Sequence, residues 1–374
     1  MERAARTVVL AANSIWNITN FRGGLIRGLR EAGYAPVAIA PHDKGGVKRL
    51  AELGVPFEPL AFERSGLNPL ADLVLQLRYR TILKRLSPVA FLGFTAKPNI
   101  YGTMAASSLG VPAIANVSGL GTAFMRRGAL QRIVSCLYRI AFRRASTVFF
   151  HNPDDRRRFV ERGIVRDGQA RLLPGSGIDL DRFSPAPLPP GAPIFLLIAR
   201  LLSDKGIREY VAAARMLRPH LPDARFQLLG GIDGENRSSI ARAELDSWCE
   251  KGVIEYLGET SDVRPFIEKA NAVVLPSYRE GLPRSLLEGA AMGRPLIATD
   301  VPGCRELVEE GVNGFLCAAR DPASLAPAMQ RFATLSDERR ATMGAESRRK
   351  VQEGFSENIV IRAYLDALGS LGSD

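Results

Sequence analysis

The 374-residue chain has few of the residues that build metal sites and disulfides. Its four cysteines form no C-x-x-C pair, and its three histidines, His42, His151 and His220, lie far apart in the sequence. A disulfide framework, a thiolate metal site and a histidine cluster are therefore not expected. The sequence also lacks an uncharged apolar run of about 18 residues, the length that a membrane-spanning helix needs.

Acidic residues are missing from one long segment. None lies between Leu73 and Pro153, whereas eleven Lys and Arg residues do. Residues 1–185 as a whole carry 27 Lys and Arg against 13 Asp and Glu, and residues 186–374 carry 23 against 26. Such a concentration of cations in one half of the chain indicates an anionic partner. The eleven cations are Arg78, Arg80, Lys84, Arg85, Lys97, Arg126, Arg127, Arg132, Arg139, Arg143 and Arg144.

Short apolar segments alternate with helix-like segments such as 21–32 and 46–53 along both halves of the chain. This alternation is typical of βα units with parallel sheets. A chain of this length can form two domains, and the proline-rich segment 183–190 resembles a linker. We therefore predict two doubly wound α/β domains, 1–182 and 191–356, with a cleft between them. The predicted strands are 8–12, 35–40, 89–94, 113–117, 147–150, 193–199, 225–229, 253–257, 272–275 and 296–299.

Two glutamates, Glu280 and Glu288, flank a predicted helix start. Glu280 follows an apolar strand-like segment, so it should lie at a strand's carboxyl end, where open parallel sheets bind ligands. Pro283 suits a first helical turn, and the spacing fits a clamp for a nucleotide-sugar. Acids near a helix start also offset the helix dipole by about 0.3–1 kcal/mol, and spacing alone favours that simpler explanation. The backbone amides of the predicted anion seat belong to Gly281, Leu282 and Arg284.

The longer segment 277–306 changes that balance, because it resembles the donor-binding E-x7-E region of family 4 glycosyltransferases. The resemblance implies the GT-B fold, in which two Rossmann-like domains face each other across a cleft. It places a nucleotide-sugar on the C-terminal domain and the acceptor on the N-terminal one, with the final helix 357–374 packed back on the first domain. The members it most resembles build capsule, O-antigen or lipid-linked glycans. For these the reaction is retaining transfer from a UDP-sugar, here expected to be an N-acetylhexosamine, to a polyprenyl-diphosphate-linked saccharide.

The same resemblance covers Arg200 and Lys205, whose R-x4-K-G pattern is similar to the family's pyrophosphate-binding pair. Cations there would stabilise the charge that develops on the departing diphosphate. By resemblance Glu280 orients the donor hexose and Glu288 anchors the ribose. Neither glutamate is expected to move a proton.

Three weaker motifs lie elsewhere. By resemblance, Gly258 and Thr260 form the rim of the base pocket, although an ordinary βα turn explains them equally well. Asp179 and Asp181 are formally a D-x-D metal motif, but their surroundings resemble the family's approach to the interdomain hinge. We therefore expect no metal and no cofactor beside the UDP-sugar substrate. Residues 119–124 begin like a dinucleotide fingerprint but lack its third glycine.

Polar residues follow three predicted strands of the first half and are the candidate acceptor ligands. Glycines in the predicted loop 13–25 let a backbone approach a substrate closely, and the polar side chains can bind sugar or phosphate. A solvated loop and a solvated Lys97 are the simpler alternatives. Many relatives have a histidine where this chain has Ser118, so the role of that histidine is not carried over. The candidates are Asn17, Asn20, Arg22, Lys97, Asn99, Ser118 and Gly119.

Segments 75–86 and 130–144 are both basic and apolar. Helices of this composition can lie on an anionic membrane, so we expect a cytoplasmic protein bound peripherally to the inner face of the membrane. A core-packed helix with a solvated basic face is the alternative. Two other function classes stay open: a degenerate sugar-nucleotide-binding scaffold and a basic nucleic-acid-binding protein. No recognised nucleic-acid fold accompanies the charge, so nucleic acid is not an expected partner.

Overall fold

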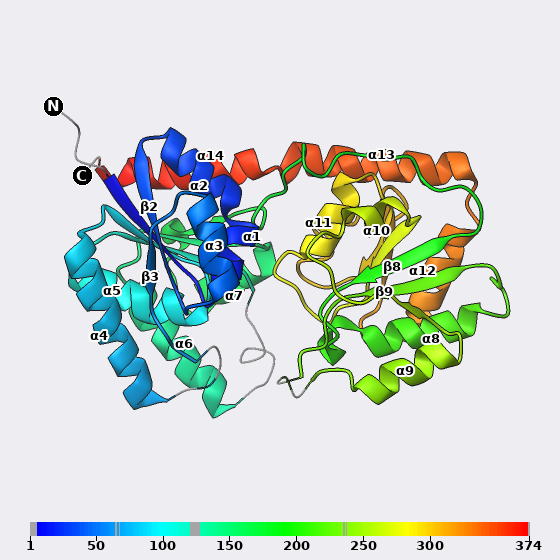
Figure 1. Cartoon of the computed structure of the whole chain (residues 1–374), viewed down its shortest axis with the longest axis horizontal. Helices are drawn as coiled ribbons and strands as arrows, with labels where there is room; N and C mark the ends of the chain where they lie inside the picture. Colours follow the sequence, from blue (N-terminus) through cyan, green and yellow to red (C-terminus); the bar gives the residue numbers. More distant parts are fainter. Residues whose placement is uncertain are drawn as a thin grey trace. The chain divides into compact units, whose positions relative to one another are not determined.

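The structure is a computed structural model that describes residues 6–63, 66, 68–119, 128–234, 236 and 238–372. Contacts divide the chain into two compact units (Figure 1): unit 1 consists of Met1–Gly177 with Glu357–Asp374, and unit 2 of Ile178–Ser356. Each unit is built around a parallel β-sheet with helices on both faces, which confirms the predicted α/β class.

Within the described residues, unit 1 has a seven-stranded sheet in the order β3-β2-β1-β4-β5-β6-β7. All neighbouring strands pair in parallel. The strands are β1 (Arg6–Ala11), β2 (Tyr34–Ala40), β3 (Phe57–Pro59), β4 (Ala90–Gly93), β5 (Ala113–Val117), β6 (Thr147–Phe150) and β7 (Ala170–Leu172). The helices are α1 (Ile15–Phe21), α2 (Gly23–Glu31), α3 (Lys44–Glu52), α4 (Pro69–Leu86), α5 (Thr103–Ser108), α6 (Ala129–Phe142), α7 (Pro153–Glu161) and α14 (Glu357–Gly369). A π-helical turn, η1 (Pro98–Gly102), leads into α5.

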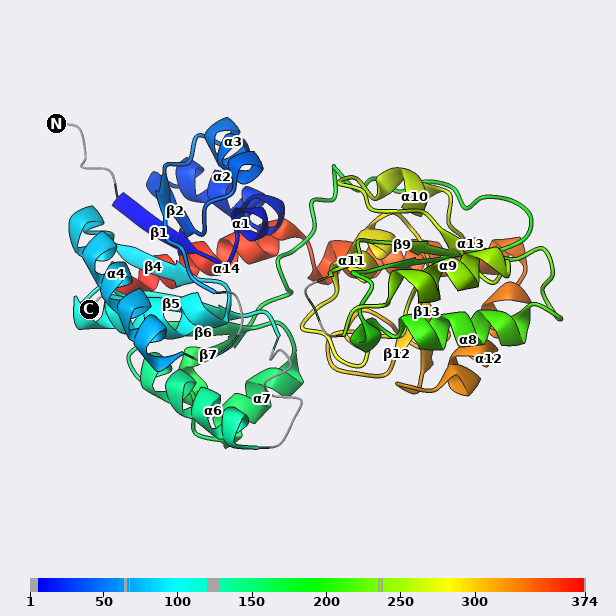
Figure 2. The same cartoon turned by 60° about the horizontal axis from the view of Figure 1, so that its bottom comes forward.

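The central strand β1 is buried on both faces, which explains its continuous apolar sequence. Val9 and Ala11 pack with α4, α5 and α6, whereas Val8 and Leu10 pack with α1, α2, α3 and α14. Figures 1 and 2 show these two helical layers on opposite faces of the sheet. The final helix α14 is therefore part of unit 1. No helix among the described residues is long and apolar enough to cross a bilayer.

Unit 2, in the part that the structure describes, has a six-stranded parallel sheet in the order β10-β9-β8-β11-β12-β13. One face packs on α8, α9 and α12, and the other on α10 and α11. The strands are β8 (Ile194–Ile198), β9 (Arg225–Leu229), β10 (Glu255–Tyr256), β11 (Ala272–Leu275), β12 (Leu296–Thr299) and β13 (Gly314–Cys317). The helices are α8 (Ile207–Leu217), α9 (Arg242–Glu250), α10 (Arg264–Glu268), α11 (Arg284–Ala291), α12 (Pro322–Ala333) and α13 (Asp337–Gly354).

The division between the units falls at Gly177, before the proline-rich segment 183–190 that the sequence suggested as the linker. Arg294, a fully buried side chain of unit 2, donates hydrogen bonds to the carbonyls of Ala186 and Pro187 at 2.8 and 3.0 Å. Burial lowers the pKa of Arg294 to about 10. The proline-rich segment supplies the acceptors that this buried guanidinium needs, and it is therefore fixed to unit 2.

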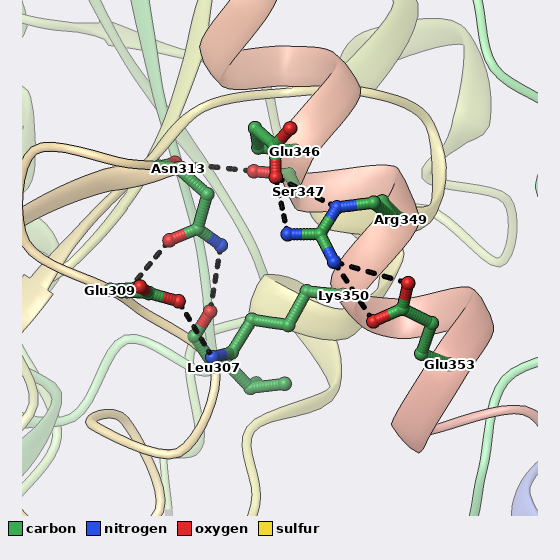
Figure 3. A network of polar contacts seen from close by, with 8 residues as sticks. All are labelled: Leu307, Glu309, Asn313, Glu346, Ser347, Arg349, Lys350 and Glu353. Carbon is green, nitrogen blue, oxygen red and sulfur yellow. Dashed lines mark hydrogen bonds and ion pairs between the residues drawn. The ribbon is translucent and has the colours of Figure 1, made fainter.

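Asn313 attaches the β12–β13 connection to α13 (Figure 3). Its side-chain Oδ1 accepts from the backbone amide of Glu309 at 2.7 Å, and its Nδ2 donates to the carbonyl of Leu307 at 2.9 Å. The carbonyl of Asn313 accepts from the hydroxyl of Ser347 on α13 at 3.2 Å. Because α13 also packs against α11, this network helps to fix the helix that carries Glu288. The exposed ion pairs in the same view involve Arg349 and Lys350.

The prediction of a polar loop over residues 13–25 is wrong, because α1 covers residues 15–21 and α2 begins at residue 23. Ser14 caps the helix by accepting a hydrogen bond from the amide of Asn17 at 3.2 Å. Ile15 and Ile18 bury their side chains under it. The short strands β3, β7 and β13 were not predicted, and β10 is shorter than its predicted range.

Gly289 lies where α11 contacts β11. A Cβ at this position would lie 2.6 Å from Cγ2 of Val273, a buried and branched side chain. We expect Gly289→Ala to lower the free energy of unfolding by about 1–3 kcal/mol, because overpacking outweighs the gain in helix propensity. Urea denaturation followed by circular dichroism measures this change.

Gly354→Ala is the matched control, since Gly354 ends α13 and a Cβ there would meet no atom within 4 Å. It should leave the free energy of unfolding unchanged or raise it slightly. Equal stability of the two variants would contradict the close packing of α11 on β11.

Candidate active site

The loops at the carboxyl edge of the unit 2 sheet bring two predicted donor-side residues together. Lys205 lies after β8 in a 3₁₀ turn, η4 (Ser203–Lys205), and Glu280 lies after β11. The Nζ of Lys205 is 2.5 Å from Oε1 of Glu280. Their side chains are only 21% and 13% exposed. Two residues far apart in the sequence thus form a largely buried ion pair.

Two glycines allow the segments of this pair to touch through their backbones. Gly206 has φ +73°, and a Cβ there would lie 2.1 Å from the carbonyl oxygen of Pro276. Gly303 has φ +89°, and a Cβ there would lie 2.7 Å from the carbonyl group of Glu280. The amide of Glu280 also donates to the carbonyl of Pro302 at 3.1 Å. A side chain at either glycine would displace η4, here called the lysine turn, or residues 276–280, here called the glutamate segment.

Arg200 lies in the same loop as Lys205 but outside the buried pair. Its side chain is 64% exposed and its NH1 lies 3.3 Å from Oδ2 of Asp233. An exposed pair of this kind contributes little to stability because water screens it. The guanidinium of Arg200 can therefore exchange Asp233 for another anion at low cost.

Glu288 lies one turn into α11, as the sequence predicted, and Pro283 precedes the helix with φ −74°. The Glu288 side chain is 14% exposed, and its Oε1 lies 3.1 Å from NH2 of Arg284. Burial raises the pKa of Glu288, and this effect outweighs the opposing influence of Arg284. Arg182 and Asp262 also lie close enough to affect this pKa. Gly281 and Leu282, which complete the predicted anion seat, are buried before the helix start.

The predicted base-pocket loop is stabilised by hydrogen bonds within the loop and by one backbone bond from Gly230. The Thr260 hydroxyl accepts from the amide of Asp262 and donates to its carbonyl, each at 3.1 Å. Gly258 has φ +79° and its carbonyl accepts from the amide of Gly230 at 2.8 Å. A Cβ at Gly258 would meet open space, so backbone freedom rather than crowding requires the glycine.

In unit 1, three of the predicted acceptor residues lie around the junction of α1 and α2. Asn17 and Asn20 are on α1, and Arg22 lies between the helices. The guanidinium of Arg22 is buried and stands 4.5 Å from the ring centre of Phe94. Burial and Arg22 together lower the pKa of His151 to about 3. His151, which the sequence did not assign to this edge of the sheet, is therefore neutral at pH 7.

Lys97 and Asn99 are occupied by partners within unit 1. The Nζ of Lys97 lies 2.8 Å from Oδ1 of Asp72, and the hydroxyl of Tyr101 donates to the same carboxylate at 2.9 Å. Lys97 is buried, so the alternative of a solvated lysine is wrong. Asn99 is also buried and its Nδ2 donates to the carbonyl of Asn116 at 2.8 Å. Contact of either side chain with an acceptor would require these bonds to open.

Ser118 and Gly119 follow β5 directly, as predicted. Just before them, the Nδ2 of Asn116 donates to the hydroxyl of Tyr364 on α14 at 2.8 Å. The rest of the glycine-containing motif at 119–124 lies outside the described residues.

The formal D-x-D motif closes a turn. Oδ1 of Asp179 accepts from the amides of Asp181 and Arg182 at 3.1 and 2.9 Å. Across the described ranges, no group of three or more His, Cys, Asp or Glu side chains is arranged to hold a metal ion.

Several residues near the predicted site were missed. The Glu306 carboxylate accepts from the amide of Gly303 at 2.6 Å, and Tyr278 contacts the lysine turn. Both belong to the segment that carries the family resemblance, so their place in the sequence was the available signal. No sequence pattern pointed to Arg182 or Asp262, because their proximity to Glu288 depends on the path of the chain around it.

Comparison with known proteins assigns both units to glycosyltransferase families. A family model described as "Glycosyl transferases group 1" matches residues 192–334, and one described as "Glycosyl transferase 4-like domain" matches residues 18–175. The chain is 28% identical over 367 residues to the N,N'-diacetylbacillosaminyl-diphospho-undecaprenol alpha-1,3-N-acetylgalactosaminyltransferase of Campylobacter jejuni, covering 93% of this chain and 94% of that protein. It is 26% identical over 282 residues to the UDP-Gal:alpha-D-GlcNAc-diphosphoundecaprenol alpha-1,3-galactosyltransferase of Escherichia coli, covering 72% and 71%.

Solved structures support the fold. A glycosyltransferase from Rickettsia africae ESF-5 superposes with a TM-score of 0.81 at 18% identity and 100% coverage of both chains. Anabaena HepE, crystallised with UDP and glucose, superposes with a TM-score of 0.79 at 17% identity, covering 98% of this chain and 100% of HepE. One family model on each unit and a relative similar along almost its full length lead to one conclusion: the chain belongs to the family 4 glycosyltransferases and has the GT-B fold.

Proposed function

We propose that the protein is a retaining transferase that moves a sugar, an N-acetylhexosamine, from a UDP-sugar to a polyprenyl-diphosphate-linked saccharide. The observation that carries this proposal is the buried Lys205–Glu280 pair beside the start of α11. The names of two relatives support the substrates. One is an N-acetylgalactosaminyltransferase acting on a diphospho-undecaprenol acceptor, and the other uses UDP-Gal and a diphosphoundecaprenol acceptor.

In the proposed donor complex, Lys205 and Glu280 separate to bind different parts of the UDP-sugar. The diphosphate takes Glu280's place beside Lys205, because a doubly charged anion competes strongly for a cation in a partly buried site. The amides at the start of α11 lie at the positive end of the helix dipole, which also favours binding of the diphosphate. Glu280 then accepts hydrogen bonds from the hydroxyls of the donor hexose. The exposed Arg200 leaves Asp233 to join the diphosphate.

Glu288 anchors the ribose in this proposal. A carboxylate can accept one hydrogen bond from each of the two neighbouring ribose hydroxyls. Burial raises the pKa of Glu288, which means that the surrounding protein does not fully compensate its charge. Hydrogen bonds from the ribose would supply the missing compensation.

The chemical step is proposed to take place on one face of the donor sugar. The bond between the anomeric carbon and the diphosphate oxygen breaks, and its electron pair stays with that oxygen. Lys205 and the α11 amides stabilise this charge more in the transition state than in the ground state. The acceptor hydroxyl bonds to the anomeric carbon on the same face and passes its proton to the departing oxygen.

The acceptor saccharide is proposed to bind at the carboxyl edge of the unit 1 sheet. The polar groups there are those around α1 and after β5, together with the neutral His151, which can both donate and accept a hydrogen bond. Arg22 would supply a cation for the acceptor's phosphates after its buried guanidinium turned away from Phe94. The residues proposed for contact are Asn17, Asn20, Arg22, Ser118 and Gly119.

We further propose that unit 1 binds an anionic membrane on the cytoplasmic side. Helices α4 and α6 pack on the same face of its sheet. On α4, large aliphatic side chains 46–78% exposed recur at helical spacing over the first turns, which a core-packed helix with a purely basic outer face would not show. They are Leu70, Leu73, Val74 and Leu77 on α4, with Leu130, Ile133 and Ile140 on α6. Nearby cations would meet lipid phosphates.

Replacing the proposed phosphate ligand should separate turnover from binding. We expect Lys205→Ala to lower kcat by about 100- to 1000-fold, because one cation aimed at the developing charge is lost. The Kd for UDP should change by no more than about tenfold, since Arg200 and the α11 amides remain. The assay is UDP release from several UDP-sugars with membrane-extracted lipid-linked acceptors, followed by mass measurement of the product.

Arg225→Ala is the control, because Arg225 forms an exposed pair with Glu255 on β9 and β10, away from the proposed site. It should transfer sugar at the rate of the parent protein. Undiminished transfer by Lys205→Ala would contradict the proposed function.

Glu288→Gln should weaken UDP binding without destabilising the fold. Because the pKa of Glu288 is raised in the folded protein, its charged form opposes folding above that pKa. Glutamine copies the neutral carboxyl and can still accept from Arg284. Thermal unfolding at pH 8 should therefore give an equal or higher Tm, and the difference should shrink as the pH falls through the raised pKa toward the ordinary value of 4.5.

Calorimetric titration with UDP measures the other half of this expectation, an increase in Kd of about tenfold or more for the loss of a charged hydrogen-bond acceptor. A lower Tm combined with unchanged UDP affinity would show that Glu288 is structural.

Membrane attachment is tested by co-sedimentation with vesicles of phosphatidylglycerol and phosphatidylcholine. Leu73→Glu and Leu77→Glu should each reduce the bound fraction several-fold, because a carboxylate opposes both insertion and the anionic surface. Leu172→Glu is the matched control, since Leu172 is 51% exposed on β7 of the same unit. Equal binding by all three variants would contradict docking through α4.

A further inference from the structure

Tyr278 connects the glutamate segment to the chain on either side of Lys205. It lies two residues before Glu280, and its amide donates to the carbonyl of Asp204 at 2.9 Å. Its hydroxyl donates to Oε1 of Glu209, in the first turn of α8, at 2.6 Å. Asp204 immediately precedes Lys205, and Glu209 follows it by four residues. Tyr278 therefore contacts the chain on either side of the proposed phosphate ligand.

Ser277 strengthens the same connection. Its hydroxyl donates to the carbonyl of Asp204 at 3.1 Å, so that carbonyl receives two hydrogen bonds from the glutamate segment. The carbonyl of Ser277 accepts in turn from the hydroxyl of Thr299 at the end of β12 at 2.5 Å. The lysine turn is thereby tied to two neighbouring strands through one short segment.

Arg320 holds the ring of Tyr278 from a third direction. Its guanidinium carbon stands 4.5 Å from the ring centre, within the range of a cation–π contact. The backbone of Arg320 has φ +61°, a left-handed conformation that residues other than glycine rarely adopt. The strained position is one that glycine would occupy without penalty, so an arginine there indicates a use for its side chain.

Glu209 makes an incomplete set of contacts. Its Oε2 is buried and has no hydrogen-bond partner among the described residues, while Oε1 accepts from Tyr278. A buried carboxylate oxygen without a hydrogen-bond donor lowers the stability of a fold. Burial, followed by the bond to Glu209, raises the pKa of Tyr278 to about 12, so its hydroxyl stays protonated and can donate at neutral pH.

These contacts matter most when Lys205 loses Glu280 as its partner. In the proposed donor complex Glu280 turns to the hexose, and the ion pair no longer holds the lysine side chain. The backbone contacts of the turn then determine where its ammonium lies. We infer that Tyr278, held by Glu209 and Arg320, is a positioning residue that keeps Lys205 aimed at the departing diphosphate, an inference that rests on the proposed function.

Tyr278→Phe and Glu209→Ala test this inference by removing one hydrogen bond from either side. Each should lower kcat by roughly 10- to 100-fold, because a small displacement of a catalytic group has effects of this size. The Kd for UDP should stay within about twofold, since neither side chain is proposed to touch the nucleotide. Glu209→Gln keeps an oxygen acceptor for the tyrosine hydroxyl and should restore kcat to near the parent value.

Arg320→Gly distinguishes positioning from stability. Glycine relieves the left-handed backbone, so the Tm should stay equal or rise, while kcat should fall because the ring of Tyr278 loses its support. Tyr210→Phe is the control for a purely structural effect. It removes a fully buried hydroxyl that donates to the carbonyl of Phe195 at 2.8 Å. That variant should lower the Tm and leave kcat unchanged.

A second readout does not need sugar transfer. Competitive acetylation followed by mass spectrometry measures the accessibility of the Lys205 ammonium with and without UDP. In the parent protein UDP should protect Lys205, and in Tyr278→Phe protection should be weaker at the same UDP occupancy. Protection and kcat both at the parent level in Tyr278→Phe would overturn the inference. If the parent protein shows UDP protection but transfers no sugar, the proposed function fails, and the acetylation result still decides the role of Tyr278.

Discussion

The buried ion pair between Lys205 and Glu280 is the constraint on which the donor side of the fold depends. Burying one charge without the other is strongly unfavourable, so the two loops must arrive together at the sheet edge. The close backbone approaches at Gly206 and Gly303 allow the two loops to pack together. The hydrogen bond from the amide of Tyr278 to the carbonyl of Asp204 also holds them in contact. A pair that is stable yet partly accessible also suits exchange, because each partner can accept an oppositely charged or polar group of a substrate.

Unit 1 uses its positive charge in two ways. Lys97 and Arg22 are buried, and their contacts with Asp72 and Phe94 organise the carboxyl edge of the sheet. On α4 the cations are exposed next to exposed aliphatic side chains. The strong bias in the sequence is therefore not a single feature. Part of it supports the interior of the unit, and part of it is available to an anionic surface.

The sequence predicted well those features that local patterns determine. Short, mostly apolar runs indicated β5, β6, β9, β11 and β12 within a residue of their bounds, because strands buried on both faces have mostly apolar side chains. The short strands β3 and β7 were not predicted, because three residues are too few to show a periodic pattern. In addition, β3 contains a proline, and two of the three side chains of β7 are exposed. Helix α1 was not predicted, because only two of its residues, Ile15 and Ile18, are buried and the polar residues around them resemble a loop. The pairing of Lys97 with Asp72 and of Tyr278 with Glu209 depends on tertiary packing, which no local pattern encodes.

Helix α14 carries a consequence for the order in which the protein is built. Its residues follow unit 2 in the sequence, yet Val360, Tyr364 and Leu368 fill one face of the unit 1 sheet. During synthesis the first unit therefore cannot complete its core until all of the second unit has left the ribosome, and one apolar face of its sheet stays uncovered until then. The second unit is continuous and can complete its core earlier. The unit that begins the chain is thus the last to be finished.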